Sequence, residues 1–208
     1  MAATPIPALP GYPVRVTFDR DQPINRLWGI PILGMSIRWL VLVPHLIIVS
    51  IFGFGVGLSI LVAWIPVLFL GRLPGWLSDF YVTTYRYATR VGAWGLLMVG
   101  PYPPFSLDAP YPVDVQVTSG DSMNRLWGFP ILGFYLRVFL VIPHALVLFV
   151  LGIGVALALL VIWIPVLING RFPQLGYDLF GGYLRLTTRM TLWTLLMPLP
   201  YPPITPGE

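Results

Sequence analysis

Residues 46–70 read LIIVSIFGFGVGLSILVAWIPVLFL, a stretch without a single charged side chain. Residues 145–169 read ALVLFVLGIGVALALLVIWIPVLIN and also carry no charge. Both stretches contain the motif Trp-Ile-Pro-Val-Leu near their ends, at residues 64–68 and 163–167. An uncharged apolar run of about 18 residues or more is typical of a helix that spans a membrane. The two stretches therefore predict an integral membrane protein.

The two apolar stretches belong to a longer self-match within the chain. The segment that begins at Tyr12 returns 99 residues later at Tyr111, and the match continues without a gap to Pro104 and Pro203. Roughly 45% of the aligned positions are identical, and such a self-match predicts repeated structural units. We therefore predict a tandem duplication, with repeat 1 over residues 12–104 and repeat 2 over residues 111–203. Residues 1–11 and 204–208 are then tails, and residues 105–110 form a linker.

The composition agrees with a membrane location. Hydrophobic residues make up 57% of the chain and charged residues 10%, whereas a soluble domain carries about 25% charged residues. The chain has no cysteine, which excludes disulfides, thiolate metal sites and a cysteine nucleophile. The arginines are scattered singly, so nothing indicates nucleic-acid binding. The first ten residues lack both a basic residue and an apolar core, so we do not expect a signal peptide there.

Each repeat is predicted to contain a transmembrane helical hairpin. The apolar region from about Ile30 to Leu70 would form a helix of about 60 Å, twice the thickness of a hydrocarbon core of about 30 Å. Glycines at positions 53, 55 and 57, and at 152 and 154, permit a turn in its middle. We therefore expect spans over about 33–52 and 56–70 in repeat 1. The matching spans in repeat 2 cover about 132–151 and 155–169.

Two shorter elements flank each hairpin. Residues 14–18 and 113–117 alternate between apolar and polar side chains, which predicts a short strand before each hairpin. Helices are expected over about 76–98 and 175–197, and each carries arginines along one face. A basic face with aromatic flanks is typical of an interfacial amphipathic helix that lies in the membrane plane.

The positions of the arginines predict the orientation. They lie near the outer ends of the predicted spans and not at the turns between them. The positive-inside rule then places both termini, the strands and the amphipathic helices in the cytoplasm. Two spans per repeat bring repeat 2 in from the same side, so the repeats are parallel. The predicted fold is an all-α, multi-pass membrane protein with two parallel tandem repeats.

The repeated motifs resemble a known family. Tyr-Pro-Val, Asn-Arg-Leu-Trp-Gly, Pro-His, Trp-Ile-Pro-Val-Leu and Gly-Arg-x-Pro, taken together, are similar to a bacterial membrane-protein family catalogued only as a domain of unknown function, number 4389. The resemblance covers nearly the whole chain as two copies. It implies a location in the bacterial cytoplasmic (inner) membrane and supplies no reaction, ligand or catalytic residue.

The two histidines, His45 and His144, occupy matching positions. One hypothesis makes them a facing pair of ligands for haem or a chlorophyll-type pigment, because imidazole is a suitable axial ligand. The favoured interpretation is structural, because each follows a proline that removes a backbone hydrogen bond. We therefore expect no cofactor, with haem or pigment as the alternative.

Arginines are the candidate contacts to lipid headgroups. For Arg38 and Arg137 we favour snorkelling to the headgroups over a dedicated anion site. Asp79 with Arg86, and the matching pair in repeat 2, could form interfacial ion pairs or a headgroup cradle. The full set of predicted headgroup residues is Arg38, Arg72, Arg86, Arg90, Arg137, Arg171, Arg185 and Arg189.

The sequence contains no recognisable catalytic constellation, so we do not expect an enzyme. The favoured hypothesis is a non-catalytic membrane scaffold or accessory subunit that binds membrane lipids and either other membrane proteins or further copies of itself. A small oligomeric transporter or channel is the first alternative. A haem- or pigment-binding subunit of an electron-transfer or photosynthetic assembly is the second.

Overall fold

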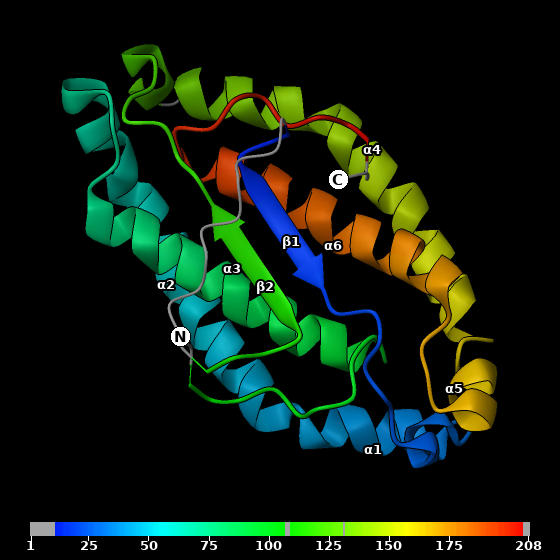
Figure 1. Ribbon diagram of the computed structural model, residues 1–208. Helices are drawn as coiled ribbons and strands as arrows, with labels where there is room; N and C mark the ends of the chain where they lie inside the picture. Colours follow the sequence, from blue (N-terminus) through cyan, green and yellow to red (C-terminus); the bar gives the residue numbers. More distant parts are fainter. Residues whose placement is uncertain (1–10, 107–108, 131, 206–208) are drawn as a thin grey trace.

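The structure is a computed structural model that describes residues 11–106, 109–130 and 132–205 (Figure 1). It is mostly helical, with one small sheet. The elements, in which η marks a 3-10 helix, are β1 Val14–Phe18, η1 Arg26–Gly29, α1 Leu33–Val41, α2 Val43–Leu70, α3 Gly75–Gly95, β2 Val113–Val117, η2 Arg125–Gly128, α4 Leu132–Leu159, α5 Trp163–Asn169 and α6 Gln174–Thr194.

The two predicted strands pair with each other. β1 and β2 are antiparallel, with Val16 opposite Val115 at the centre. Since these two valines are 99 residues apart, exchanging the strands leaves the register unchanged. Val14 and Val113 are buried with them, and Figure 1 shows the strands lying over α3 and α6. The alternation seen in the sequence therefore places the valines of both strands in one shared core.

Helices α3 and α6 form the layer beneath the strands. They begin within one residue of the predicted starts and end three residues early. The hydroxyl oxygens of Thr89 and Thr188, also 99 residues apart, lie 3.5 Å from each other. The strand pair and this helix contact therefore place equivalent positions of the two halves opposite each other.

The predicted hairpin turns are wrong, because a helix continues through both glycine segments. α2 and α4 run unbroken through Gly53–Gly57 and Gly152–Gly154. A Cβ atom at Gly55 would lie 3.1 Å from Phe80 of α3, and one at Gly154 would lie 3.4 Å from Leu179 of α6. Two of these glycines therefore allow close helix packing. Because each glycine segment lies inside one continuous helix, the predicted pairs of spans are not formed, and parallel repeats no longer follow from the number of spans.

The long helical segments break near prolines instead. α1 gives way to α2 just before Pro44, and residues 160–162 separate α4 from α5 ahead of Pro165. A proline has no N–H and clashes with the carbonyl four residues earlier, which favours such breaks. The matching prolines, Pro66 and Pro143, stay inside α2 and α4. The two halves therefore bend at different points of the same sequence pattern.

The halves exchange contacts reciprocally. η1 packs on α5, and η2 packs on α2. The contact is tight, since a Cβ atom at Gly29 would lie 2.6 Å from the backbone N of Leu167. At Gly128 it would lie within van der Waals overlap of the backbone of Leu68. The glycine of each Asn-Arg-Leu-Trp-Gly motif therefore fits against the Trp-Ile-Pro-Val-Leu motif of the other half.

Two helical segments are long and apolar enough to cross a membrane, namely Val43–Leu70 and Tyr135–Leu159. Only 11% of the most apolar window in each is buried. The core helix of a soluble protein would be mostly covered by the rest of the chain. These two helices instead leave most of their apolar side chains outside the protein core.

Candidate functional site

A buried arginine lies between two tryptophans at the base of the first half. We call Trp28, Arg38 and Trp94 the Arg38 cluster. The Arg38 side chain is 0% exposed, and its guanidinium carbon lies 3.9 Å from the ring centre of Trp94 and 5.5 Å from that of Trp28. Nε donates to the Trp94 carbonyl at 2.5 Å and Nη2 to the Val99 carbonyl at 2.7 Å. Arg38 therefore ties α1 to the end of α3.

The second half builds the same arrangement with fewer hydrogen bonds. We call Trp127, Arg137 and Trp193 the Arg137 cluster. Arg137 is 2% exposed, and its guanidinium carbon lies 4.9 Å and 4.5 Å from the two indole centres. Nη1 donates to the Trp193 carbonyl, whereas Nε has no hydrogen-bond partner among the described residues. The predicted snorkelling is wrong for both arginines, because each guanidinium is buried within the protein.

Tyrosines hold the Pro-Tyr-Pro-Pro segments beside these clusters. Tyr12 donates to the Pro200 carbonyl at 2.8 Å, and Tyr111 donates to the Pro101 carbonyl at 2.9 Å. Burial raises the pKa of both phenols above their usual range, although nearby arginines oppose the shift. Both hydroxyls therefore stay protonated and remain donors at neutral pH.

The two histidines lie in different surroundings. The His45 ring stacks on Phe105 with ring centres 4.2 Å apart, and its Nδ1 lies 2.5 Å from the Tyr87 hydroxyl. The Nε2 of His144 instead lies 2.9 Å from the Pro202 carbonyl. His144 has no equivalent of the Tyr87 hydroxyl, because the matching residue in the second half is Leu186.

The haem hypothesis would require both histidine rings to give up their present contacts. Each ring packs against the chain that follows the last helix of its own half, so binding a metal would displace these contacts. The described residues contain no group of three or more His, Cys, Asp or Glu side chains placed to hold a metal ion. The contacts fit the favoured structural interpretation of these residues.

The arginines of α3 and α6 face the sheet. Arg86 and Arg90 donate to carbonyls of β2, and Arg185 and Arg189 donate to carbonyls of β1. The pairing of Asp79 with Arg86 is wrong, because Arg86 instead lies 3.1 Å from Asp114 of β2. These four side chains thus hold the strands on the helices.

The remaining two predicted headgroup residues, Arg72 and Arg171, are exposed. Each follows a left-handed glycine that ends a helix, α2 for Gly71 and α5 for Gly170, and the side chain of another exposed arginine packs on that glycine. Arg125 lies against Gly71, and Arg26 lies against Gly170. Two exposed basic corners therefore form, one at each contact between the halves.

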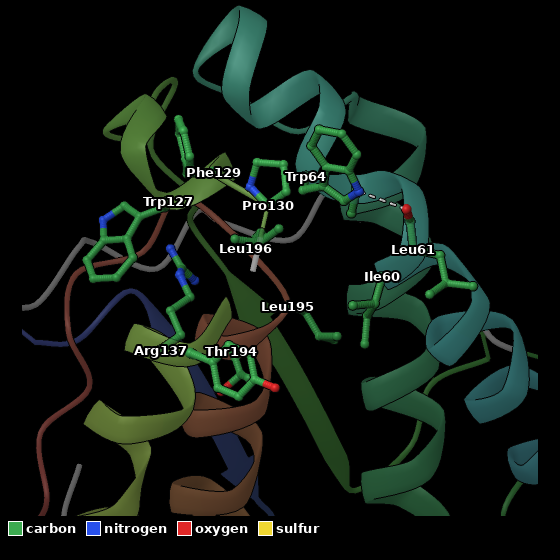
Figure 2. A pocket seen from close by; sticks show the side chains of 12 residues that line it. Ile60, Leu61, Trp64, Trp127, Phe129, Pro130, Arg137, Thr194, Leu195 and Leu196 are labelled. Atoms are coloured by element: carbon green, nitrogen blue, oxygen red, sulfur yellow. Dashed lines mark hydrogen bonds between the residues drawn. The ribbon is translucent and has the colours of Figure 1, made fainter. Parts of the chain in front are cut away.

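A cavity of about 380 Å³ opens beside the Arg137 cluster. Figure 2 shows the side chain of Arg137 rising from α4 toward Trp127, with the side chains of α2 across from it. Pro130 and Phe129 lie above it in this view. The lining residues are Ile60, Leu61, Ala63, Trp64, Trp127, Phe129, Pro130, Tyr135, Arg137, Thr194, Leu195 and Leu196.

Sequence reasoning missed this cavity, although the alignment of the two halves contains a signal for it. Three positions around the buried arginine differ between the copies. Ser36 corresponds to Tyr135, Gly95 to Thr194, and Val99 to Pro198. The cavity therefore lies where the two halves differ in sequence, whereas the predicted site residues are ones that the two halves share.

The chain resembles one known family over part of its length. The family described as Domain of unknown function (DUF4389) matches residues 33–106. The match runs from the start of α1 to just beyond the first Pro-Tyr-Pro-Pro segment. It confirms the predicted resemblance over the first half of the chain. No curated protein and no solved structure matches this chain.

Proposed function

We propose that this protein is a non-catalytic scaffold or accessory subunit of a bacterial inner membrane, built by tandem duplication. In this proposal α2 and α4 lie in the bilayer, and their outer faces bind partner membrane proteins or another copy of the chain. The two basic corners contact anionic headgroups, which attract arginines near a membrane surface.

The observation that carries the proposal is the exposed apolar side chains on both long helices. Phe54 of α2 is 69% exposed and Phe149 of α4 is 66% exposed. A contiguous apolar surface of this kind marks a site of contact with lipid or protein. In contrast, the cationic side chains of Arg38, Arg90 and Arg137 are turned inward and help to hold the fold.

The membrane location is tested by extraction. Membranes that contain the full chain are washed with alkaline carbonate and then solubilised in a gentle detergent. The proposal expects the protein to resist carbonate and to dissolve only with detergent. Release by carbonate would overturn the membrane part of the proposal.

The scaffold role is tested by crosslinking, which the absence of native cysteines makes simple. Phe54→Cys and Phe149→Cys each place one thiol on an exposed apolar face. Gln116→Cys on the sheet is a matched control away from these faces. We expect crosslinks, either to a second copy or to another membrane protein, from the two helix positions only. A mass equal to one chain, with no crosslink from either helix position, would contradict the scaffold role.

A further inference from the structure

We propose that the cavity beside Arg137 binds one anionic amphiphile, with its carboxylate or phosphate on the Arg137 guanidinium and its acyl chain against α2. The inference rests on the proposed membrane location, because the ligand would enter from the bilayer. It adds a specific internal site to a protein whose proposed headgroup contacts are at its exposed corners.

The first argument is the charge of Arg137. An arginine side chain remains protonated in proteins, and a buried charge is costly unless it is paired. The ion pairs of the described residues are Arg20 with Asp178 and Arg86 and Arg90 with Asp114. None of them includes Arg137, so no carboxylate of the described residues neutralises this buried cation.

The second argument is the free donor. Arg38 donates to two carbonyls, those of Trp94 and Val99. In the second half the position of Val99 is taken by Pro198, whose carbonyl accepts instead from the Gly120 N–H at 2.9 Å. Arg137 therefore donates to Trp193 alone. Among the described residues its buried Nε has no partner, and neither has the buried Nη1 of Arg38, so the two arginines differ in the number of carbonyls that they reach and in the cavity beside Arg137. A carboxylate or phosphate can accept two parallel hydrogen bonds from the edge of a guanidinium.

The third argument is the shape and lining of the cavity. Its volume of about 380 Å³ lies within the range of small-molecule sites, roughly 300–1,000 Å³. Ile60 and Leu61 of α2 form an apolar wall opposite Arg137 (Figure 2). Leu61 is 70% exposed, so the wall continues onto the apolar outer face of the helix. One charged end and one apolar side match an amphiphile better than a free inorganic anion.

The test uses the full chain in phosphatidylcholine vesicles. Binding is followed by the quenching of tryptophan fluorescence by a brominated fatty acid, since Trp64 and Trp127 line the cavity. Three competitors are compared in separate arms, namely oleate, phosphatidylglycerol and inorganic phosphate. Methyl oleate, which has the chain without the charge, is the control. Competition by oleate or by phosphatidylglycerol supports the proposal and identifies the source of the anion.

Two variants test the position of the site. Arg137→Gln is expected to weaken binding roughly tenfold or more, because a charge-assisted hydrogen bond is lost. Ile60→Trp keeps Arg137 and fills the cavity, so we expect a similar loss. Leu159→Trp, at the matching position of the second half, and Arg38→Gln are controls that should change the apparent Kd by less than about twofold. Circular dichroism checks that each variant is folded.

The proposal is overturned if methyl oleate or inorganic phosphate competes as well as oleate and phosphatidylglycerol, or if no competitor reduces the quenching. It is also overturned if folded Ile60→Trp binds as tightly as the unaltered chain. These results would leave the carbonate and crosslinking results unchanged, so failure of this inference is distinct from failure of the scaffold proposal.

Discussion

The Arg38 and Arg137 clusters have the same three residue types at the same spacing, yet they offer different chemistry. Arg38 is held by two carbonyls between Trp28 and Trp94. Arg137 is held by one carbonyl and borders a cavity. Each guanidinium keeps one buried nitrogen without a partner among the described residues. The identity of a buried arginine therefore does not decide its role. The neighbours that can accept its hydrogen bonds decide it.

The largest effect is expected from disrupting the contact between η2 and α2, which lies on the same side as Arg137. A Cβ atom at Gly128 would overlap the backbone of α2 at Leu68, so Gly128→Ala should lower the free energy of unfolding by about 3 kcal/mol or more. It should also open the cavity, because η2 and α2 form opposite walls. Denaturation in detergent micelles measures the first effect, and ligand quenching measures the second.

Gly29→Ala is the matched change on the other side, where η1 packs on α5. It should cost a similar free energy of unfolding while leaving ligand quenching intact. Equal loss of quenching in both variants would contradict the assignment of the cavity to one side.

The next effect compares the two arginines directly. Arg38→Met removes two hydrogen bonds and leaves the Val99 carbonyl without its donor, so it should cost about 2–4 kcal/mol. Arg137→Met removes one hydrogen bond, to a Trp193 carbonyl that still accepts from the Leu196 N–H, and should cost about 1 kcal/mol. Methionine retains much of the apolar stem, so the packing between the indoles changes little. If chemical denaturation gave the same loss for both variants, the difference in hydrogen bonding would have no energetic consequence.

A smaller difference is expected at the histidines. Tyr87→Phe removes the hydroxyl that lies 2.5 Å from the buried His45 Nδ1, and it should cost about 1–2 kcal/mol. Thermal unfolding followed by circular dichroism should give Tyr87→Phe a lower midpoint than the unaltered chain, and an unchanged midpoint would contradict this hydrogen bond.

The smallest effect should be symmetric. Tyr12→Phe and Tyr111→Phe each remove one hydrogen bond to a proline carbonyl, at a cost of about 1 kcal/mol each. Because these bonds are equivalent, the two costs should agree within about 0.5 kcal/mol and should add in the double variant. Urea titration in micelles measures all three. Strongly unequal costs would contradict this equivalence and would show that the two halves also differ energetically outside the arginine clusters.

Several elements could be predicted because their signals are local. The period-two pattern placed both strands, and the helices α3 and α6 begin where expected. Asn25 and Asn124 cap the segments that follow them, since their side chains accept from the backbone N–H groups of Leu27 and Leu126. Each of these features depends on residues only a few positions apart.

The errors share a different cause. The glycines near residue 55 permit a turn, but Phe80 of another helix packs there and the helix continues. Arg86 finds Asp114 on β2 rather than Asp79 on its own helix. The position of Arg38 within an apolar segment predicts snorkelling. The carbonyls of Trp94 and Val99 hold it inside the protein instead, and both are distant from Arg38 in sequence. In each case a partner from another element decided the outcome.

Composition and spacing alone establish the 99-residue correspondence, the two long apolar stretches and the matching positions of both arginines. The continuous helices, the packing of each glycine motif on the other half and the cavity beside Arg137 depend on contacts between distant parts of the chain. The physical reason is that a buried polar group is satisfied only by atoms brought near it in space. Pro198 occupies the position in the second half that Val99 occupies in the first, and its carbonyl accepts from the Gly120 N–H, so Arg137 donates to one carbonyl fewer than Arg38.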